Sequence, residues 1–211
     1  MELSGHYNWI YASGNFPVSL RPSGVFNCPK FPASSSWKHE NDNLSVNFGK
    51  YGTYLMKSSS NTNKIFEGYL STNPNDWRKM EYVKPLSESE ELLIGDGGGS
   101  VWEWEWEKGT FEVEFICDAI NHFVCKQFPA HSHWSLNDNT IDVDWGKYGK
   151  YELVIDPSTK TMTGFVKNNN SSWRKAKFIR PLGIDALTSA PSHDHSHHHE
   201  HGSSCGSGCD H

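Results

Sequence analysis

The sequence lacks the features that mark several large classes of protein. No apolar run approaches the roughly 18 residues that a membrane-spanning helix needs. The first residues, Met1 to His6, have neither the charged nor the apolar region of a signal peptide. The net charge is −6, and no basic run is longer than Arg174-Lys175 with Lys177, whereas nucleic-acid binders usually show a basic face. We therefore expect a cytoplasmic protein with neither a nucleic-acid nor a membrane partner.

Enzyme signatures are also missing. The chain has no nucleophile elbow, P-loop, His-Glu-x-x-His or dinucleotide fingerprint, and the spacing of its carboxylates suggests no acid–base pair. Cys28 and Cys125 could be thiol nucleophiles, but buried strand residues are the simpler interpretation. We predict no catalytic residue and no organic cofactor.

Cysteine is scarce. The chain has five, and an odd number without a signal peptide favours free or metal-bound thiols over a disulfide framework. One structural disulfide, Cys117–Cys125 across a hairpin, stays open as an alternative.

The chain does contain an internal repeat, which a self-comparison reveals. The matched pairs, first copy before second, include Tyr7 and Trp102, Trp9 and Trp104, Cys28 and Cys125, Trp37 and Trp134, Tyr51 and Tyr148, Tyr54 and Tyr151, Trp77 and Trp173, and Arg78 and Arg174. So many ordered matches exclude chance. We predict a first unit at 1–86, a Ser/Glu linker at 87–93, a second unit at 94–182 and a tail at 183–211.

Each unit is patterned for short strands. The run Trp102-Glu103-Trp104-Glu105-Trp106-Glu107 alternates with a period of two, which places Trp on a buried face and Glu in solvent. Short links favour an antiparallel meander, and residues 1–182 show no helical period. About seven strands with one apolar face must roll up to bury it. We predict an all-β protein made of two tandem antiparallel meanders of about ninety residues. Each is a small barrel or a sandwich, and two separate barrels or one fused sandwich are both open.

Two features of each unit resemble the calycin superfamily of lipocalins and avidins. They are the opening Gly-x-aromatic pattern, Gly5-His6-Tyr7-Asn8-Trp9 in the first unit, and the late arginines Arg78 and Arg174. In that family a Trp of the first strand packs against an Arg near the last strand and plugs one end of the barrel. The resemblance implies a barrel and supports the binding of a small ligand.

A set of aromatic and arginine residues recurs in both units. One interpretation is a pocket that binds a small apolar or aromatic ligand through stacking and cation–π contacts. The other is that the rings fill a small barrel and the arginines stack at its end. The candidate ligand-binding residues are Trp37, Tyr51, Tyr54, Trp77, Arg78, Trp134, Tyr148, Tyr151, Trp173 and Arg174.

The tail changes character and concentrates metal-binding side chains. Its candidate ligands are His193, His195, His197, His198, His199, His201, Cys205, Cys209 and His211. Imidazole and thiolate suit Zn²⁺, Cu and Ni²⁺, and Gly/Ser spacers let the chain fold around an ion. Similar His-rich ends occur on some metallochaperones and metal-responsive folding factors. The tail has nothing apolar to bury, so we expect disorder without metal. A solubilising end and an expression tag are the alternatives.

A second candidate metal site lies inside the second unit. His131 and His133 are two residues apart, so on a strand they face the same way, and Cys125 is nearby in sequence. The first unit has Ser34 and Ser36 at the matching places. Ordinary surface histidines are the simpler alternative.

These features together predict a metal-binding protein that sequesters or delivers Zn, Cu or Ni through the tail. The alternative functions are a calycin-like module for a small ligand and a scaffold for a protein partner.

Overall fold

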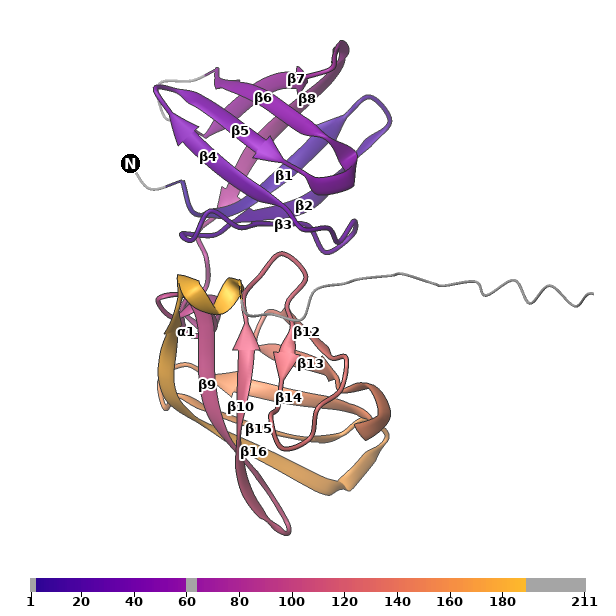
Figure 1. Cartoon of the computed structure of the whole chain (residues 1–211), viewed down its shortest axis with the longest axis vertical. Coiled ribbons are helices and arrows are strands. Elements are labelled where there is room, and N and C mark those ends of the chain that lie inside the picture. Colours follow the sequence, from indigo (N-terminus) through magenta and orange to yellow (C-terminus); the bar gives the residue numbers. More distant parts are fainter. Residues whose placement is uncertain (1–2, 60–63, 189–211) are drawn as a thin grey trace, which may run out of the picture.

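The computed structural model describes residues 3–59 and 64–188, and its strands form two eight-stranded antiparallel sheets that follow one another along the chain (Figure 1). The first sheet contains β1 (Gly5–Tyr11), β2 (Gly14–Leu20), β3 (Phe26–Asn27), β4 (Ser36–Glu40), β5 (Asn43–Asn47), β6 (Thr53–Ser58), β7 (Ile65–Leu70) and β8 (Asn73–Lys84). The second contains β9 (Gly97–Trp106), β10 (Gly109–Ile116), β11 (Phe123–Val124), β12 (His133–Asn137), β13 (Thr140–Asp144), β14 (Lys150–Asp156), β15 (Thr161–Val166) and β16 (Asn169–Gly183).

Both sheets curl into nearly closed barrels. The strand order in the first is β3-β2-β1-β8-β7-β6-β5-β4, and the second repeats it with β9 to β16. Within each barrel, strands that are consecutive in sequence pair with one another except the third and the fourth, and the first strand also pairs with the last. A single bridge joins the two ends of each sheet, Val25 to Ser36 in the first and His122 to His133 in the second. The predicted all-β antiparallel meander is confirmed, and it forms two barrels rather than one sandwich.

The alternating pattern of β9 determines which side chains fill the second barrel. Trp102 and Trp104 are fully buried, whereas Glu103 and Glu105 are exposed. Trp104 contacts Phe123, Trp145 and Tyr151 edge-on, with ring centroids 5.8, 5.8 and 5.5 Å apart. Such edge-to-face contacts are favourable because a ring's positive edge meets the negative face of its neighbour. The barrel interior is therefore packed with aromatic rings.

The structure has one more strand per unit than the sequence indicated. The extra strands are β3 and β11, which are two residues long each. Two residues are too few to show an alternation, so the pattern could not reveal them. The Cys117–Cys125 disulfide that the sequence left open is not formed, and both cysteines are buried free thiols.

The expectation that residues 1–182 contain no helix is wrong. Helix α1 (Glu88–Ile94) forms in the Ser/Glu segment between the barrels. Ser87 Oγ accepts from the Glu90 amide at 3.2 Å, and Glu90 Oε2 accepts from the Ser87 amide at 2.8 Å, a capping box that satisfies two otherwise unpaired donors. Leu93 and Ile94 join the core of the second barrel. Seven residues are too short for a visible helical period. No helix in the described ranges is long and apolar enough to cross a membrane.

Candidate functional site

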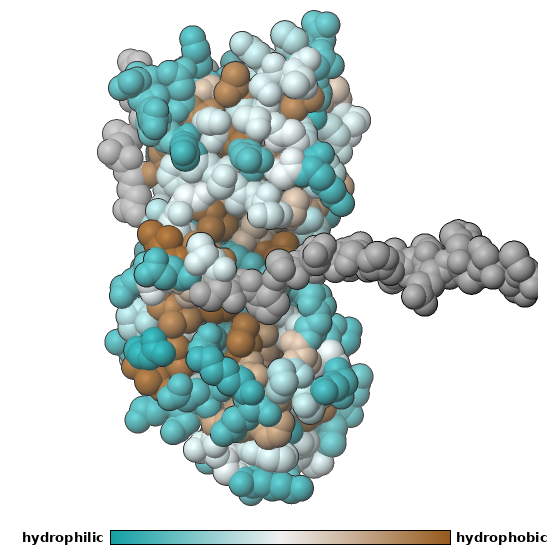
Figure 2. All heavy atoms as spheres, viewed as in Figure 1, coloured by the Kyte–Doolittle hydropathy of each residue, from teal (hydrophilic) through white to brown (hydrophobic). Residues whose placement is uncertain are grey.

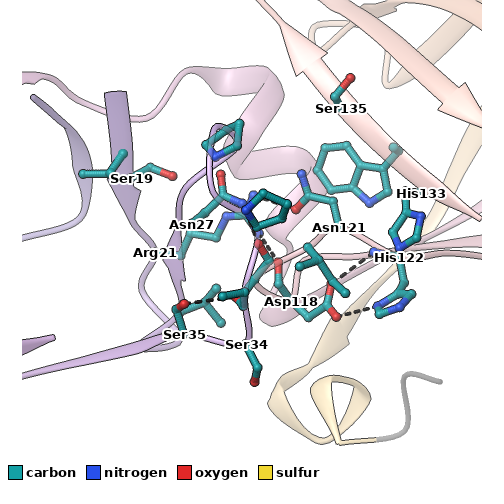
Figure 3. Close-up of a pocket in the computed structure, with 18 of the residues that line it drawn as sticks. Ser19, Arg21, Asn27, Ser34, Ser35, Asp118, Asn121, His122, His133 and Ser135 are labelled. Atoms are coloured by element: carbon teal, nitrogen blue, oxygen red, sulfur yellow. Dashed lines mark hydrogen bonds and ion pairs between the residues drawn. The ribbon is translucent and has the colours of Figure 1, made fainter. Parts of the chain in front are cut away.

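A cleft of about 1210 Å³ lies where the two barrels meet, and residues from both of them line it. Apolar residues gather at this junction on the molecular surface (Figure 2). The cleft lining combines apolar side chains with polar ones, and Arg21, Asn27 and Ser35 of the first barrel face Asp118 and other polar residues of the second (Figure 3). The cleft is therefore the place where polar and charged side chains of the two barrels come together.

Arg21 connects the first barrel to the β10–β11 loop of the second. Its Nη1 donates to the carbonyls of Cys117 and Asp118, both at 2.9 Å, and its Nη2 donates to Asn121 Oδ1 at 2.9 Å. Asn27 Nδ2 donates to the Ala119 carbonyl of the same loop at 3.0 Å. Arg21 is only 6% exposed. Burial of its charged guanidinium is costly, and the hydrogen bonds to the loop offset this cost. These contacts hold the loop in place.

A second contact between the barrels involves helix α1. Nε2 of His6, on β1, lies 2.8 Å from Oε2 of Glu90. Burial raises the pKa of Glu90, but the hydrogen bonds from His6 and Ser87 outweigh burial and hold this pKa below its usual value of 4.5. The ionised form of Glu90 therefore stabilises the folded protein.

Three imidazole rings cluster beside the cleft, which His122 and His133 line, and we call His122, His131 and His133 the histidine cluster. The ring centroids of His131 and His133 are 4.6 Å apart, those of His122 and His133 are 5.0 Å apart, and those of His122 and His131 are 6.3 Å apart. His122 is buried, His133 is half-buried and His131 is exposed. The cluster therefore extends from the interior of the cleft to solvent.

Pairing across the barrel's closing edge produces this cluster. His122 bridges His133, and the amides of Phe123 and Trp134 donate to the carbonyls of Ser132 and Asn121, both at 2.9 Å. His131 precedes β12 by two residues, so the sequence interpretation that it shares a side with His133 agrees with their ring contact. The structure thus brings together two of the three predicted residues of this site and adds His122, which the sequence analysis missed.

Asp118 orients the ring of His122. Its Oδ2 lies 2.5 Å from Nδ1 of His122, and its Oδ1 accepts from the backbone amide of His122 at 3.0 Å (Figure 3). A carboxylate on one imidazole nitrogen fixes the tautomer and leaves the opposite nitrogen, Nε2, as the atom through which a metal ion would be bound. This is the arrangement found behind many histidines that bind metals.

The first barrel has no counterpart of this arrangement. The bridge and the hydrogen bonds at the closing edge of the first barrel match those of the second. They show that Val25, Ser34 and Ser36 take the places of the three histidines. Five residues, 21–25, separate the paired Leu20 and Phe26, whereas seven, 116–122, separate the paired Phe115 and Phe123. The loop that carries Asp118 is therefore two residues longer in the second barrel. The barrel fold requires neither the histidines nor the longer loop.

The cluster is not a finished metal site. Among residues 3–59 and 64–188, no group of three or more His, Cys, Asp or Glu side chains is arranged to hold a metal ion as it stands. The predicted third ligand, Cys125, packs in the hydrophobic core, and burial raises the pKa of its thiol, which disfavours the thiolate that a metal binds. The predicted tail ligands, His193 to His211 with Cys205 and Cys209, lie outside the described residues.

The aromatic and arginine set takes structural positions in both barrels. The Arg78 guanidinium lies 5.0 Å from the ring of Tyr54, and that of Arg174 lies 5.3 Å from the ring of Tyr151. The hydroxyls of Tyr54 and Tyr151 donate to the carbonyls three residues earlier, and the indoles of Trp37 and Trp134 donate to the carbonyls of Arg21 and Ile116. At the surface, Tyr51, Trp77 and Tyr148 are exposed and Trp173 is partly buried. Binding of a ligand by this set stays a prediction.

Comparison with known proteins gave no match: no family model, curated protein or solved structure is similar enough to this chain to indicate its family.

Proposed function

We propose that this protein binds a transition-metal ion, Zn²⁺, Cu or Ni²⁺, at the histidine cluster of the second barrel. The observation that carries the proposal is the grouping of three imidazoles at the cleft, one of them held by a carboxylate. The first barrel has Val25, Ser34 and Ser36 at these places. Because the fold does not require the histidines, a function is the simplest reason for their grouping.

The spacing of the rings is close to that of a metal site. With Zn–N bonds of about 2.0–2.1 Å and tetrahedral angles, imidazole centroids in a zinc site are roughly 5 Å apart. The separations of 4.6, 5.0 and 6.3 Å span that value. No group of three His, Cys, Asp or Glu side chains in the described residues is arranged to hold an ion as it stands, so rotations about side-chain bonds are needed before the nitrogens of these rings converge. Exposed His131 is the ring that can turn most easily.

The exposure of the cluster favours exchange of the ion over permanent storage. His131 is exposed and His133 is half-buried, so an ion can enter and leave from solvent. His122 is held by two contacts with the Asp118 carboxylate. Sequestration or delivery of a metal ion fits this arrangement better than a buried structural site, in which four ligands close around zinc.

The test is a zinc titration by calorimetry under reducing conditions on the full-length chain. We expect the histidines and cysteines of residues 193–211 to bind zinc independently of the barrels. A tail-silent variant is therefore needed to isolate the histidine cluster. It carries asparagine at the seven tail histidines and serine at Cys205 and Cys209. We expect His131→Asn with His133→Asn to weaken zinc binding in both the wild-type and the tail-silent chain. His39→Asn, a half-buried histidine on β4, is the matched control. Unchanged affinity in both backgrounds would reject the proposal.

We also propose that the two barrels are related in architecture to the calycin superfamily. Eight strands follow in sequential order and the first pairs with the last. Arg174 of β16 lies 5.6 Å from the ring of Trp106 on β9, and Arg78 of β8 lies 5.8 Å from the ring of Tyr11 on β1. An arginine of the last strand thus lies over an aromatic ring of the first in each barrel, and this contact supports the proposed kinship, although the ring in the first barrel is Tyr11 rather than the Trp that the resemblance implies. Because rings fill the interiors, the cleft is a better location than the barrels for a small ligand.

A further inference from the structure

The histidine cluster borders a space much larger than a metal ion. His122 and His133 line the cleft between the barrels, so an ion held between their rings lies at the wall of that cleft. The cleft measures about 1210 Å³, whereas small-molecule sites ordinarily measure roughly 300–1,000 Å³. Figure 3 shows the two histidines on the far side of Asp118 from Arg21 of the first barrel. The cleft therefore has room for an organic molecule beside the ion.

Three histidines leave one coordination position of a zinc ion open. Zinc takes four ligands, and sites with three protein ligands keep the fourth position for water or substrate. Cys125 packs in the hydrophobic core, and both carboxylate oxygens of Asp118 are engaged with His122, so neither side chain is placed to fill that position. A ligand that enters from the cleft can complete the coordination.

The charges around the cleft determine which kind of ligand it attracts. The cationic residues that line it, Arg21 and Lys50, balance the anionic ones, Glu90 and Asp118, when the histidines are neutral. A bound zinc ion therefore changes the formal charge of the lining from zero to +2. Arg21 is buried and its guanidinium already donates to the loop, so the ion is the group that attracts a ligand. The metal-loaded cleft thus favours an anion.

Apolar side chains occupy both walls of the cleft. The first barrel contributes the exposed Pro17, Pro29 and Pro32, and the second contributes the half-buried Ile120 and Leu136. A molecule in contact with both walls removes this apolar surface from water, which stabilises the complex. The cleft therefore suits a ligand with one anionic end and an apolar body.

From these observations we propose that the metal-loaded cleft binds a small organic carboxylate. A carboxylate oxygen takes the coordination position that the histidine cluster leaves open, and the apolar body lies between the walls of the two barrels. Carboxylate oxygen is an ordinary zinc ligand, at about 2.0–2.2 Å from the ion. This inference rests on the proposed function.

Three probes separate the contributions of the charge and of the apolar body. Phenylacetate has both, acetate has the carboxylate without the ring, and phenylacetamide has the ring without the charge. Each is titrated by calorimetry into the full-length tail-silent variant, with one equivalent of zinc and again without metal. We expect phenylacetate to bind the zinc-loaded chain at least about tenfold more tightly than acetate, the discrimination that a single methylene gives in a hydrophobic pocket. Phenylacetamide should bind more weakly than phenylacetate.

Zinc and the carboxylate should strengthen each other's binding. We expect zinc to raise the affinity for phenylacetate by roughly 5- to 150-fold, the usual range of coupling between two ligands. Because such coupling is reciprocal, phenylacetate must raise the affinity for zinc by the same factor, which chelator competition measures. A zinc affinity that phenylacetate leaves unchanged would contradict coordination of the carboxylate.

A pair of isoleucine variants locates the apolar body. Ile120→Ser, in the tail-silent background, removes apolar surface from the cleft wall and should weaken phenylacetate by about tenfold or more, with little effect on acetate. Ile179→Ser is the matched control, at an exposed isoleucine of β16 outside the cleft. Both variants should bind zinc with the affinity of their parent. Equal effects of the two substitutions on phenylacetate would place the ligand elsewhere and overturn the inference.

The outcomes separate the inference from the proposed function. If the tail-silent chain binds zinc at the histidine cluster but binds phenylacetate no better than acetate or phenylacetamide, the proposed function stands and the inference fails. Equal binding of phenylacetate with and without zinc also rejects the inference alone. If the tail-silent chain binds no zinc at the cluster, the proposed function and the inference fail together.

Discussion

Asp118 Oδ2 lies 2.5 Å from Nδ1 of His122, and the same aspartate is tied to the opposite barrel because its carbonyl accepts from Arg21. A single loop therefore carries both the orienting carboxylate of the candidate metal site and the contact that joins the two barrels. The geometry of the cluster and the packing of the barrels are linked through this loop.

Removal of the carboxylate charge should weaken metal binding without unfolding the protein. Asp118→Asn keeps an oxygen that accepts from the His122 amide but loses the anion at Nδ1. Loss of such an outer-shell partner lowers metal affinity by roughly 10- to 100-fold. Chelator competition with zinc measures the change. Asp142→Asn, which removes a carboxylate paired with Lys167 at the barrel surface, should leave the affinity unchanged; equal losses in both variants would contradict the role given to Asp118.

Arg21 should contribute strongly to stability, because Arg21→Ala leaves buried carbonyls on the 117–121 loop without their donor. Hydrogen bonds from a charged donor contribute about 1.5–3 kcal/mol each, and Arg21 donates three, so we expect a loss of at least about 4.5 kcal/mol in the free energy of unfolding. Urea denaturation measures it. Arg180→Ala, at an exposed arginine, should cost under about 0.5 kcal/mol. A loss for Arg21→Ala as small as that for Arg180→Ala would show that the barrel contact contributes little.

The contact between His6 and Glu90 should make stability fall in acid. Because the folded-state pKa of Glu90 is below its usual 4.5, the stabilisation is present above about pH 4.5. This stabilisation disappears as the pH falls through the lower pKa that Glu90 has in the folded protein. Below that pH the folded and the unfolded protein both carry a protonated Glu90. Glu90→Gln retains a capping-box residue but removes the charge, so it should cost on the order of 1 kcal/mol at pH 7 and progressively less in acid. Thermal unfolding from pH 3 to 7 tests this. Exposed Glu91 supplies the control variant Glu91→Gln, and a constant difference across the range would refute the assignment.

The cysteines of the barrels should resist alkylation in the native protein. Burial raises the pKa of Cys117 to about 12 and also raises the pKa values of Cys28 and Cys125, so little thiolate is present at neutral pH. Iodoacetamide labelling at pH 7.5, mapped by mass spectrometry, should modify these three residues only after denaturation. Rapid labelling of Cys125 in the folded chain would show that it is accessible and would restore it as a candidate metal ligand.

The sequence predicted the fold well because strand alternation and the repeat are local signals. Trp102 and Trp104 face inward and Glu103 and Glu105 face solvent, as their order along the chain indicates. The sequence did not reveal helix α1, because a seven-residue helix is defined by the Ser87–Glu90 capping box rather than by a hydrophobic period.

The candidate site could be predicted only in part. His131 and His133 are neighbours in sequence, but His122 joins them only through the bridge that closes the barrel, a long-range contact. A signal for its loop was nonetheless present. Val18 and Val113 differ by 95 positions, whereas Cys28 and Cys125 differ by 97, which places a two-residue insertion in the segment that carries Asp118 and His122.

The most direct test of the metal site is anomalous X-ray diffraction at the zinc edge from crystals of the full-length protein grown with zinc. We predict an anomalous peak about 2.0–2.1 Å from Nε2 of His122 and from one ring nitrogen each of His131 and His133. Asp118 should still contact Nδ1 of His122. A structure with zinc bound only elsewhere, and with the three rings placed as they are without metal, would contradict the assignment of the histidine cluster as the metal site.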